Sequence, residues 1–353
     1  MVYDKLVDGD QSRLTTRGWV WLAEGIGALK TWLMGKEESR RCRLLFIMEL
    51  TGCGTALVTP FRRDGGVDEA ALHSLVNWQV ESGIDFLVPC GTTGEASTLT
   101  EQEWLRVIEV VVAAAAGRVP IFAGCTHNAT HEAVVRARKL SQVHGLAGIL
   151  TANPYYNRPG QDGQFQHFKA IAEATQLPLL LYNIPSRTGA NLEPATVLRL
   201  AGLKNVIGIK ESSGNIAQIT ELLTTAPTNF KVFAGDDGLV LPVLALGGAG
   251  LVSVASNVIP GQMARMVRAA LESDWTEARR INRQFFKLMQ AHFWEASPAP
   301  VKAVLAMLGR GEDVLRLPLV PVSDATRGRL ERMVGELGML VGVPHAGEDL
   351  RVF

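Results

Sequence analysis

The chain has 353 residues, of which 47% are hydrophobic and 20% charged, and its 35 basic residues balance its 35 acidic residues. This length suits one large domain or two ordinary ones, and the composition is that of a globular protein with a substantial core. A formal net charge of zero provides no basic field for a phosphate backbone, which argues against nucleic acid as a partner.

Residues 1–48 differ in character from the rest of the chain and are interpreted as an N-terminal extension. They begin with an acidic run, contain an apolar stretch interrupted by Glu24 and Lys30, and end in a basic cluster around Cys42. The apolar part is too short and too charged for a membrane span, and the acidic start does not suit a signal peptide. An amphipathic docking helix is one interpretation, since three of the seven tryptophans lie here. The simpler expectation is that the natural chain begins at Met48 and that residues 1–47 are an artefact of start assignment.

From Gly54 onward, short β-rich runs alternate with longer segments of helical apolar spacing. We expect eight strands, at 56–59, 85–88, 121–123, 148–150, 179–182, 206–210, 232–234 and 250–254. We expect helices between them, at 68–82, 101–116, 132–144, 164–175, 194–200, 216–224 and 237–246. Strand–helix alternation indicates parallel strands with right-handed crossovers, and eight such units close a (β/α)8 TIM barrel, here over residues 49–272. An open doubly wound sheet is disfavoured because no G-x-G-x-x-G follows the first strand.

Residues 273–340 have the pattern of helices only and are expected to form a C-terminal helical appendage. Helical spacing covers 275–290, 300–308 and 324–340, with Pro298 and Pro300 as breaks and 309–311 as a turn. Residues 341–353 contain two glycines and a proline and are expected to form a loose tail.

Polar residues collect after the expected strands, where the active site of a TIM barrel lies. Gly91-Thr92-Thr93-Gly94-Glu95 follows the second strand, and its backbone N–H groups can form a cradle for a carboxylate. Residues 153–159 follow the fourth strand, 182–189 end the fifth, and 235–238 end the seventh. An amine, phenols, hydroxyls and a guanidinium thus meet on one face, which favours imine chemistry on a small oxo acid.

Lys210 is the expected reacting group. It ends the apolar run 206–209 and is followed at once by polar residues and the turn at Gly214-Asn215. Burial disfavours the ammonium form and favours the free amine, which is the form that attacks a carbonyl. The alternative is a lysine that extends from the strand end into solvent. Its place among the other strand-end groups favours the reacting amine.

The other groups also have purely structural interpretations. The Gly-Thr-Thr-Gly segment could be only a tight turn, the Tyr155-Tyr156 pair could lie in an interface, and Arg187 could form a surface ion pair. The Asp236-Asp237 pair is expected to cap a helix. Acid–base catalysis by these two carboxylates would need a further partner that the sequence does not supply.

Cysteine and histidine spacing gives no indication of a metal site. The four cysteines are scattered and lack the paired spacing of zinc or redox sites. The one close histidine pair, His127 and His131, is not in the zinc-protease order. We therefore expect no bound metal, and the cysteine usage suits a cytoplasmic location.

The segments at the ends of the expected strands resemble those of a known family. Residues from about Gly54 to Leu340 are similar to the dihydrodipicolinate synthase (4-hydroxy-tetrahydrodipicolinate synthase) family of pyruvate-dependent Schiff-base aldolases. The segments that carry the resemblance are Ala56-Leu57-Val58-Thr59-Pro60-Phe61, Gly91-Thr92-Thr93-Gly94-Glu95, Pro154-Tyr155-Tyr156-Asn157-Arg158-Pro159, Tyr182-Asn183-Ile184-Pro185-Ser186-Arg187-Thr188-Gly189, Gly208-Ile209-Lys210-Glu211 and Gly235-Asp236-Asp237.

The resemblance implies a lyase that condenses pyruvate with L-aspartate 4-semialdehyde in the diaminopimelate route to lysine, without a cofactor. Lys210 would form the imine with pyruvate, and Tyr182 would lie over that imine and pass protons. Thr92 would link Tyr182 to Tyr156, which in this family reaches into the site of the neighbouring subunit. The family is usually a dimer of dimers, so the resemblance implies a homotetramer.

The resemblance also implies how the two substrates are held. Thr93 and adjacent backbone amides would bind the pyruvate carboxylate, and the backbone of Val252, at the eighth strand, would face the pocket. Arg187 would bind the carboxylate of the semialdehyde. Sibling enzymes, N-acetylneuraminate lyase and the oxo-sugar-acid aldolases, keep Lys210 and Tyr182 but take longer hydroxylated partners, so Arg187 favours the synthase. A non-catalytic barrel is the alternative of another class, and it is disfavoured because each of these catalytic and binding roles has a matching residue in the chain.

Feedback inhibition by lysine is a further property of the family, whose regulatory site lies at the dimer interface. The matching positions here are Ala96, Ser97, Glu101, Trp104, Asn128, Glu132 and Tyr155. Glu101 and Trp104 stand where lysine-sensitive bacterial enzymes often carry histidines. We therefore expect weak inhibition by lysine.

Overall fold

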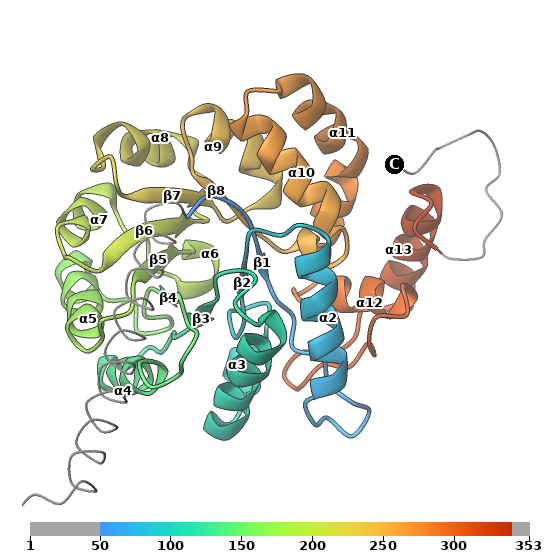
Figure 1. Cartoon of the computed structure of the whole chain (residues 1–353), viewed down its shortest axis with the longest axis horizontal. Helices are drawn as coiled ribbons and strands as arrows, with labels where there is room; N and C mark the ends of the chain where they lie inside the picture. Colours follow the sequence, from blue (N-terminus) through green and yellow to red (C-terminus); the bar gives the residue numbers. More distant parts are fainter. Residues whose placement is uncertain (1–49, 341–353) are drawn as a thin grey trace, which may run out of the picture. The chain divides into compact units, whose positions relative to one another are not determined.

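A computed structural model of the protein describes residues 50–340, and these residues contain an eight-stranded parallel sheet (Figure 1). The expected extension 1–48, with the start at Met48, and the expected tail 341–353 lie outside the described residues. The strand order is β2-β1-β8-β7-β6-β5-β4-β3, and a parallel bridge between Leu87 and Ile121 joins the two outer strands. The sheet therefore closes on itself, which confirms the predicted TIM barrel.

The strands and helices alternate along the chain as the sequence pattern predicts. The strands are β1 Gly52–Ala56, β2 Phe86–Val88, β3 Phe122–Gly124, β4 Gly148–Ala152, β5 Leu179–Asn183, β6 Val206–Glu211, β7 Lys231–Ala234 and β8 Gly250–Ser253. The helices of the barrel are α2 Glu69–Glu81, α3 Glu101–Ala115, α4 Thr130–Leu140, α5 Gln161–Glu173, α6 Pro185–Thr188, α7 Pro194–Ala201, α8 Ile216–Thr225, α9 Val240–Ala245 and α10 Pro260–Leu271. Of these, α6 and α10 lie outside the seven helical segments expected from the sequence.

The predicted C-terminal helical region is confirmed as three helices. They are α11 Trp275–Ala291, α12 Ala299–Met307 and α13 Asp324–Glu336. The chain between α12 and α13, which includes Val314 and Arg316, has no regular secondary structure. Helix α13 is shorter than predicted, because it ends at Glu336 and not at residue 340.

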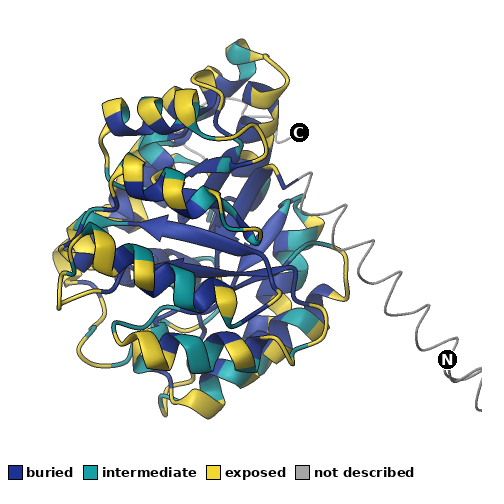
Figure 2. Cartoon of the chain, turned by 90° about the vertical axis from the view of Figure 1, so that its left-hand side faces the viewer, coloured by how far each residue is buried: buried dark blue, intermediate teal, exposed yellow. Residues whose placement is uncertain are grey.

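Two apolar layers form the core. The larger lies between the sheet and the surrounding helices. The smaller fills the barrel interior, where the Phe86 ring meets the edges of Phe122 and Phe233 at centroid distances of 6.2 and 5.5 Å. Figure 2 shows the strands almost entirely buried, whereas each helix turns one buried face inward and one exposed face outward. Because side chains fill the barrel interior, a substrate would bind at the carboxyl ends of the strands, where active sites of this fold lie.

The first strand lies four residues earlier than the pattern predicts, at Gly52–Ala56 and not at 56–59, so the predicted strand residues 57–59 lie outside it. Gly52 has a φ of 97°, and a Cβ atom there would lie 2.2 Å from a carboxylate oxygen of Asp85. A Cβ atom on Gly54 would lie 2.1 Å from the ring of Phe86. The glycines therefore let β1 approach its neighbours closely. Because glycines usually mark turns, the sequence pattern did not predict a strand at these residues.

Within residues 50–340, no helix has the length and apolar character needed to span a membrane.

Candidate active site

Lys210 and Tyr182 form the centre of the site. They are aligned in register on the neighbouring strands β6 and β5, so their side chains point to the same side of the sheet. Lys210 is 4% exposed, and its Nζ lies 4.2 Å from the centre of the Tyr182 ring. None of the ion pairs among the described residues involves Lys210, so no carboxylate engages its amine. The amine is thus buried next to a phenol, as the imine hypothesis requires.

A glycine on the next strand end makes room for Lys210. A Cβ atom on Gly235, after β7, would lie 2.9 Å from two carbons of the lysine side chain and 1.9 Å from the hydroxyl of Ser212. Any larger residue would displace the lysine stem. The Gly235-Asp236 segment therefore shapes the space in which the amine lies.

The loop after β2 carries the two threonines of the predicted carboxylate cradle. Thr93 is buried and Thr92 is exposed. The loop folds back on itself, since the Gly94 N–H donates to the Gly91 carbonyl at 3.1 Å and the Glu95 N–H to the Thr92 carbonyl at 3.1 Å. The hydroxyl of Thr59 donates to the Gly94 carbonyl at 2.7 Å, which fixes the loop to the end of β1.

The loop after β4 places Tyr156 on the surface. Its side chain is 88% exposed, and its backbone has a φ of 74°, an unusual value for a residue other than glycine. The Tyr156 N–H donates to the Thr188 carbonyl at 3.3 Å, which joins this loop to the one after β5. Within the single chain no hydrogen bond links Tyr182, Thr92 and Tyr156. The structure therefore does not assemble the predicted Tyr–Thr–Tyr chain within one subunit.

Arg187 lies in the short helix α6 and is exposed. Its guanidinium forms none of the ion pairs or hydrogen bonds found among the described side chains. The helix is fixed by the hydroxyl of Thr188, which donates to the carbonyls of Ile184 and Ala190 at 3.1 and 2.9 Å. No ion pair among residues 50–340 therefore occupies this guanidinium, and it is exposed at the rim of the candidate site.

Three further residues lie in or just after strands β7 and β8: Asp236, Asp237 and Val252. Asp236 caps the turn of residues 237–239 by accepting from the Gly238 N–H at 2.8 Å, so the predicted capping role is confirmed. Asp237 is buried and accepts from the N–H groups of Val254 and Ala255 after β8, and its burial raises its pKa. Val252 lies within β8 with its side chain in the barrel interior.

Sequence analysis missed a buried polar cluster on the outer side of β5 and β6. Glu211 accepts from the amide of Asn183 at 3.0 Å, from the Ser213 N–H at 2.6 Å and from the amide of Gln218 at 3.3 Å. Burial is the main influence on the Glu211 carboxyl, and it raises the pKa above the usual range. Because Glu211 directly follows Lys210, its anchoring on one face of β6 fixes the strand end that presents the lysine on the other.

The positions that match the family's lysine site are not equally available. Trp104 is 1% exposed, and its indole N–H donates to the Gly124 carbonyl at 3.0 Å. Glu101 forms an ion pair with Lys139. The remaining positions are exposed or partly exposed, and they are Ala96, Ser97, Asn128, Glu132 and Tyr155.

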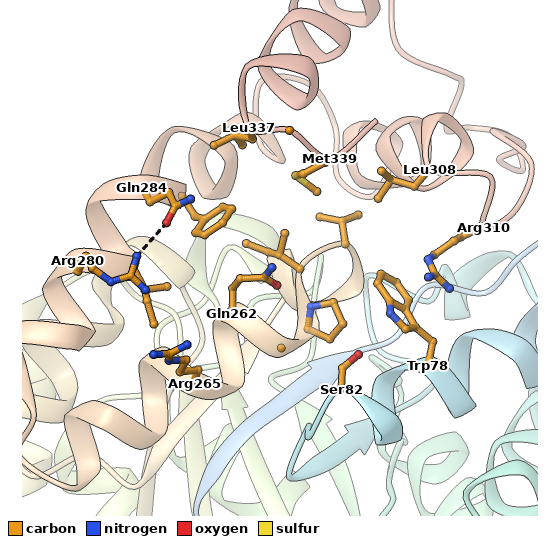
Figure 3. A pocket seen from close by; sticks show the side chains of 17 residues that line it. Trp78, Ser82, Gln262, Arg265, Arg280, Gln284, Leu308, Arg310, Leu337 and Met339 are labelled. Carbon is orange, nitrogen blue, oxygen red and sulfur yellow. Dashed lines mark hydrogen bonds between the residues drawn. The ribbon is translucent and has the colours of Figure 1, made fainter. Parts of the chain in front are cut away.

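A cleft of about 870 Å³ lies apart from these residues, between α10, α11 and the chain after α13 (Figure 3). At one side of the cleft, the guanidinium carbon of Arg310 lies 3.7 Å from the ring centre of Trp78. At the other side, the guanidinium of Arg280 donates a hydrogen bond to the side-chain oxygen of Gln284. None of its lining residues is a predicted site residue. Across residues 50–340, no three His, Cys, Asp or Glu side chains are grouped to hold a metal ion.

Comparison with known proteins identifies the family. The model of the dihydrodipicolinate synthetase family matches residues 49–337. The 4-hydroxy-tetrahydrodipicolinate synthase of Acidobacterium capsulatum is 62% identical over 298 residues, which are 84% of this chain and 99% of that protein.

Solved structures agree with this match. The dihydrodipicolinate synthase of Aquifex aeolicus is 40% identical, with a TM-score of 0.81 over 83% of this chain and 100% of that one. The synthase of Acinetobacter baumannii, complexed with pyruvate, is 38% identical, with a TM-score of 0.81 over 82% of this chain and 100% of that one. The chain therefore belongs to the dihydrodipicolinate synthetase family.

Proposed function

We propose that this protein condenses pyruvate with L-aspartate 4-semialdehyde to give 4-hydroxy-tetrahydrodipicolinate, in the diaminopimelate route to lysine. The observation that carries the proposal is the buried amine of Lys210 beside the Tyr182 ring at the carboxyl end of the barrel. The names of the close relatives agree with it.

The chemistry follows from the amine. Lys210 attacks the keto carbon of pyruvate, and loss of water gives an imine. The imine withdraws electrons, so a methyl proton leaves and the resulting enamine attacks the aldehyde carbon of the semialdehyde. The amino group of the second substrate then attacks the imine carbon, which closes the ring and releases Lys210 as the free amine.

These steps require protons to leave the lysine amine and the methyl group of pyruvate, and a proton to reach the hydroxyl that departs as water. Tyr182 is the phenol next to the amine, and it can pass protons without a charged base. We assign Thr92 and Tyr156 as the further members of the relay. Thr93 and the backbone around it would hold the pyruvate carboxylate, with the backbone of Val252 facing the same space.

Arg187 supports the choice of second substrate. Its guanidinium, which has no partner among residues 50–340, offers two parallel N–H donors to a carboxylate, which a lysine could not imitate. The sibling aldolases take a longer hydroxylated partner, for which a lone cationic fork is a poor match. A coupled assay with pyruvate and the semialdehyde tests the proposal. Equal turnover with N-acetylmannosamine as the acceptor would support the sibling activity instead, and absence of both would favour a non-catalytic barrel.

We further propose an assembly of at least a dimer, and a homotetramer by family resemblance. Tyr156 supports this, because a largely exposed tyrosine at the rim of the site can reach a neighbouring subunit. Buried free Cys53, Cys90 and Cys125 suit a reducing compartment, so we place the protein in the cytoplasm.

Mixing two inactive variants tests whether Tyr156 acts across the interface. We expect Tyr156→Phe and Lys210→Ala each to be inactive alone, and co-refolded mixtures to recover turnover. In a mixed dimer, the Tyr156→Phe subunit keeps its own Lys210 and receives Tyr156 from its neighbour. Steady-state rates of the mixture give the measurement. A mixture as inactive as its parents, in spite of hybrid assembly shown by native mass spectrometry, would contradict action across the interface.

Lysine is expected to inhibit only weakly. Trp104 is buried with its N–H already bonded, and Lys139 competes with a lysine ligand for the carboxylate of Glu101. A steady-state titration with lysine checks this expectation. Half-inhibition at low micromolar lysine would overturn it.

A further inference from the structure

A buried ion pair joins the Thr92–Thr93 loop to the C-terminal helical region. Glu95, the last residue of the Gly-Thr-Thr-Gly-Glu segment, forms an ion pair with Lys302 on α12. The side chain of Glu95 is 0% exposed and that of Lys302 is 2% exposed. The ammonium also donates to the Val314 carbonyl at 2.9 Å and lies 4.1 Å from the ring centre of Phe61. The loop of the candidate site is thus fixed from outside the barrel.

Arg316 completes the anchor. Its backbone N–H donates to the second oxygen of Glu95 at 3.1 Å, so both oxygens are held by the C-terminal region. Its guanidinium forms a two-pronged bond with Glu103 and donates to the Gly65 and Thr98 carbonyls at 2.7 and 3.0 Å. The bond with Arg316 lowers the pKa of Glu103 to about 2.

The geometry of Glu95 ties this anchor to the threonines. Glu95 has a φ of 50°, and its N–H donates to the Thr92 carbonyl at 3.1 Å. On its other side, the hydroxyl of Thr98 donates to the Glu95 carbonyl at 2.9 Å. Rotation of Glu95 would therefore move its N–H away from the Thr92 carbonyl and break this bond. It would also shift Thr93, which lies between the two residues in the chain.

Stability alone gives no reason for this arrangement. Burial lowers the pKa of Lys302, and the neighbouring Glu95 carboxylate opposes that shift. The attraction within the pair therefore offsets only part of the free-energy cost of removing the two charges from water. A well-packed apolar pair of similar volume is often as stable as a buried ion pair, or more stable. An apolar pair would have no carboxylate, and it could not be held in one orientation by directional hydrogen bonds as both oxygens of Glu95 are.

We propose that Glu95, Lys302 and Arg316 are positioning residues that hold the Thr92–Thr93 loop in the shape that receives the substrate carboxylate. The inference rests on the proposed function. It assigns the C-terminal helical region a part in pyruvate binding that acts through the loop and not through direct contact with pyruvate.

The test compares Lys302→Met with Val304→Ala, a control that opens a cavity at a fully buried position of the same helix. We expect both variants to lower the melting temperature. Only Lys302→Met should raise the pyruvate KM, by about tenfold or more, and the semialdehyde KM should stay unchanged in both. The double variant Glu95→Gln/Lys302→Met leaves no buried unpaired charge. It should recover melting temperature while the pyruvate KM stays high.

The outcomes separate this inference from the proposed function. A wild-type chain without turnover would overturn both. Normal wild-type turnover with an unchanged pyruvate KM in Lys302→Met would overturn the inference alone, and so would a double variant with the wild-type pyruvate KM. If Lys302→Met does not fold, the double variant decides by the same readout.

Discussion

Replacing Lys210 by alanine is expected to abolish turnover, with a loss on the order of 10⁴-fold or more. The reason is covalent: without the amine no imine forms, and pyruvate has no electron sink to acidify its methyl group. A binding contact would cost far less, so the size of the loss distinguishes a reacting group from a contact. Steady-state rates in the coupled assay give the measurement.

The control for this variant is Lys204→Ala, which removes an exposed lysine just before the same strand. It should keep wild-type rates and wild-type melting temperature. If Lys210→Ala turned over at a tenth of the wild-type rate or faster, covalent catalysis by this residue would be excluded.

Replacing Arg187 by alanine should act on one substrate only. A carboxylate loses a two-pronged charged bond worth about 1.5–3 kcal/mol, so the semialdehyde KM should rise roughly 10- to 100-fold. Formation of the pyruvate imine should persist, because Arg187 lies in α6 and Lys210 in β6, and the two do not bond. Imine formation can be followed separately by borohydride trapping with pyruvate alone.

Two further variants sharpen this test. Arg187→Lys keeps the charge but not the planar fork, and it should recover only part of the loss. Arg199→Ala removes a surface arginine on α7 that pairs with Asp162, and it should leave both KM values unchanged. An equal loss of pyruvate trapping and semialdehyde use in Arg187→Ala would mean that the residue supports the site as a whole and does not select the second substrate.

The fold was predictable because its signals are local. Each strand of the barrel is a short apolar run, and each following helix has its own apolar spacing, so alternation could be read without knowledge of distant contacts. The first strand is the exception. Gly52 and Gly54 serve a close approach to β2, and that approach exists only once the barrel has closed.

The placement of the residues at the centre of the candidate site was predictable, because both follow from the strand pattern. Lys210 and Tyr182 end adjacent strands, and the barrel brings such ends together by its topology. The anchor of Glu95 could not be read in this way. Lys302 lies 207 residues further along the chain, and nothing in the spacing of two charged residues reveals that they meet in a buried pair.

Tyr156 marks another limit of prediction from one chain. The family resemblance assigns it to a proton relay, yet in the single subunit its side chain is 88% exposed. In the proposed relay it would act on the site of a second copy, and the mixing experiment is therefore the informative one for that residue.

The central claim is that Lys210 forms an imine with pyruvate, and reduction of that imine tests it most directly. The protein is incubated with pyruvate and sodium borohydride, and the product is analysed by intact mass and peptide mapping. We expect one reduced pyruvyl group per chain, located on Lys210 and absent from Lys210→Ala. An unmodified wild-type chain, or an adduct on another lysine, would contradict it.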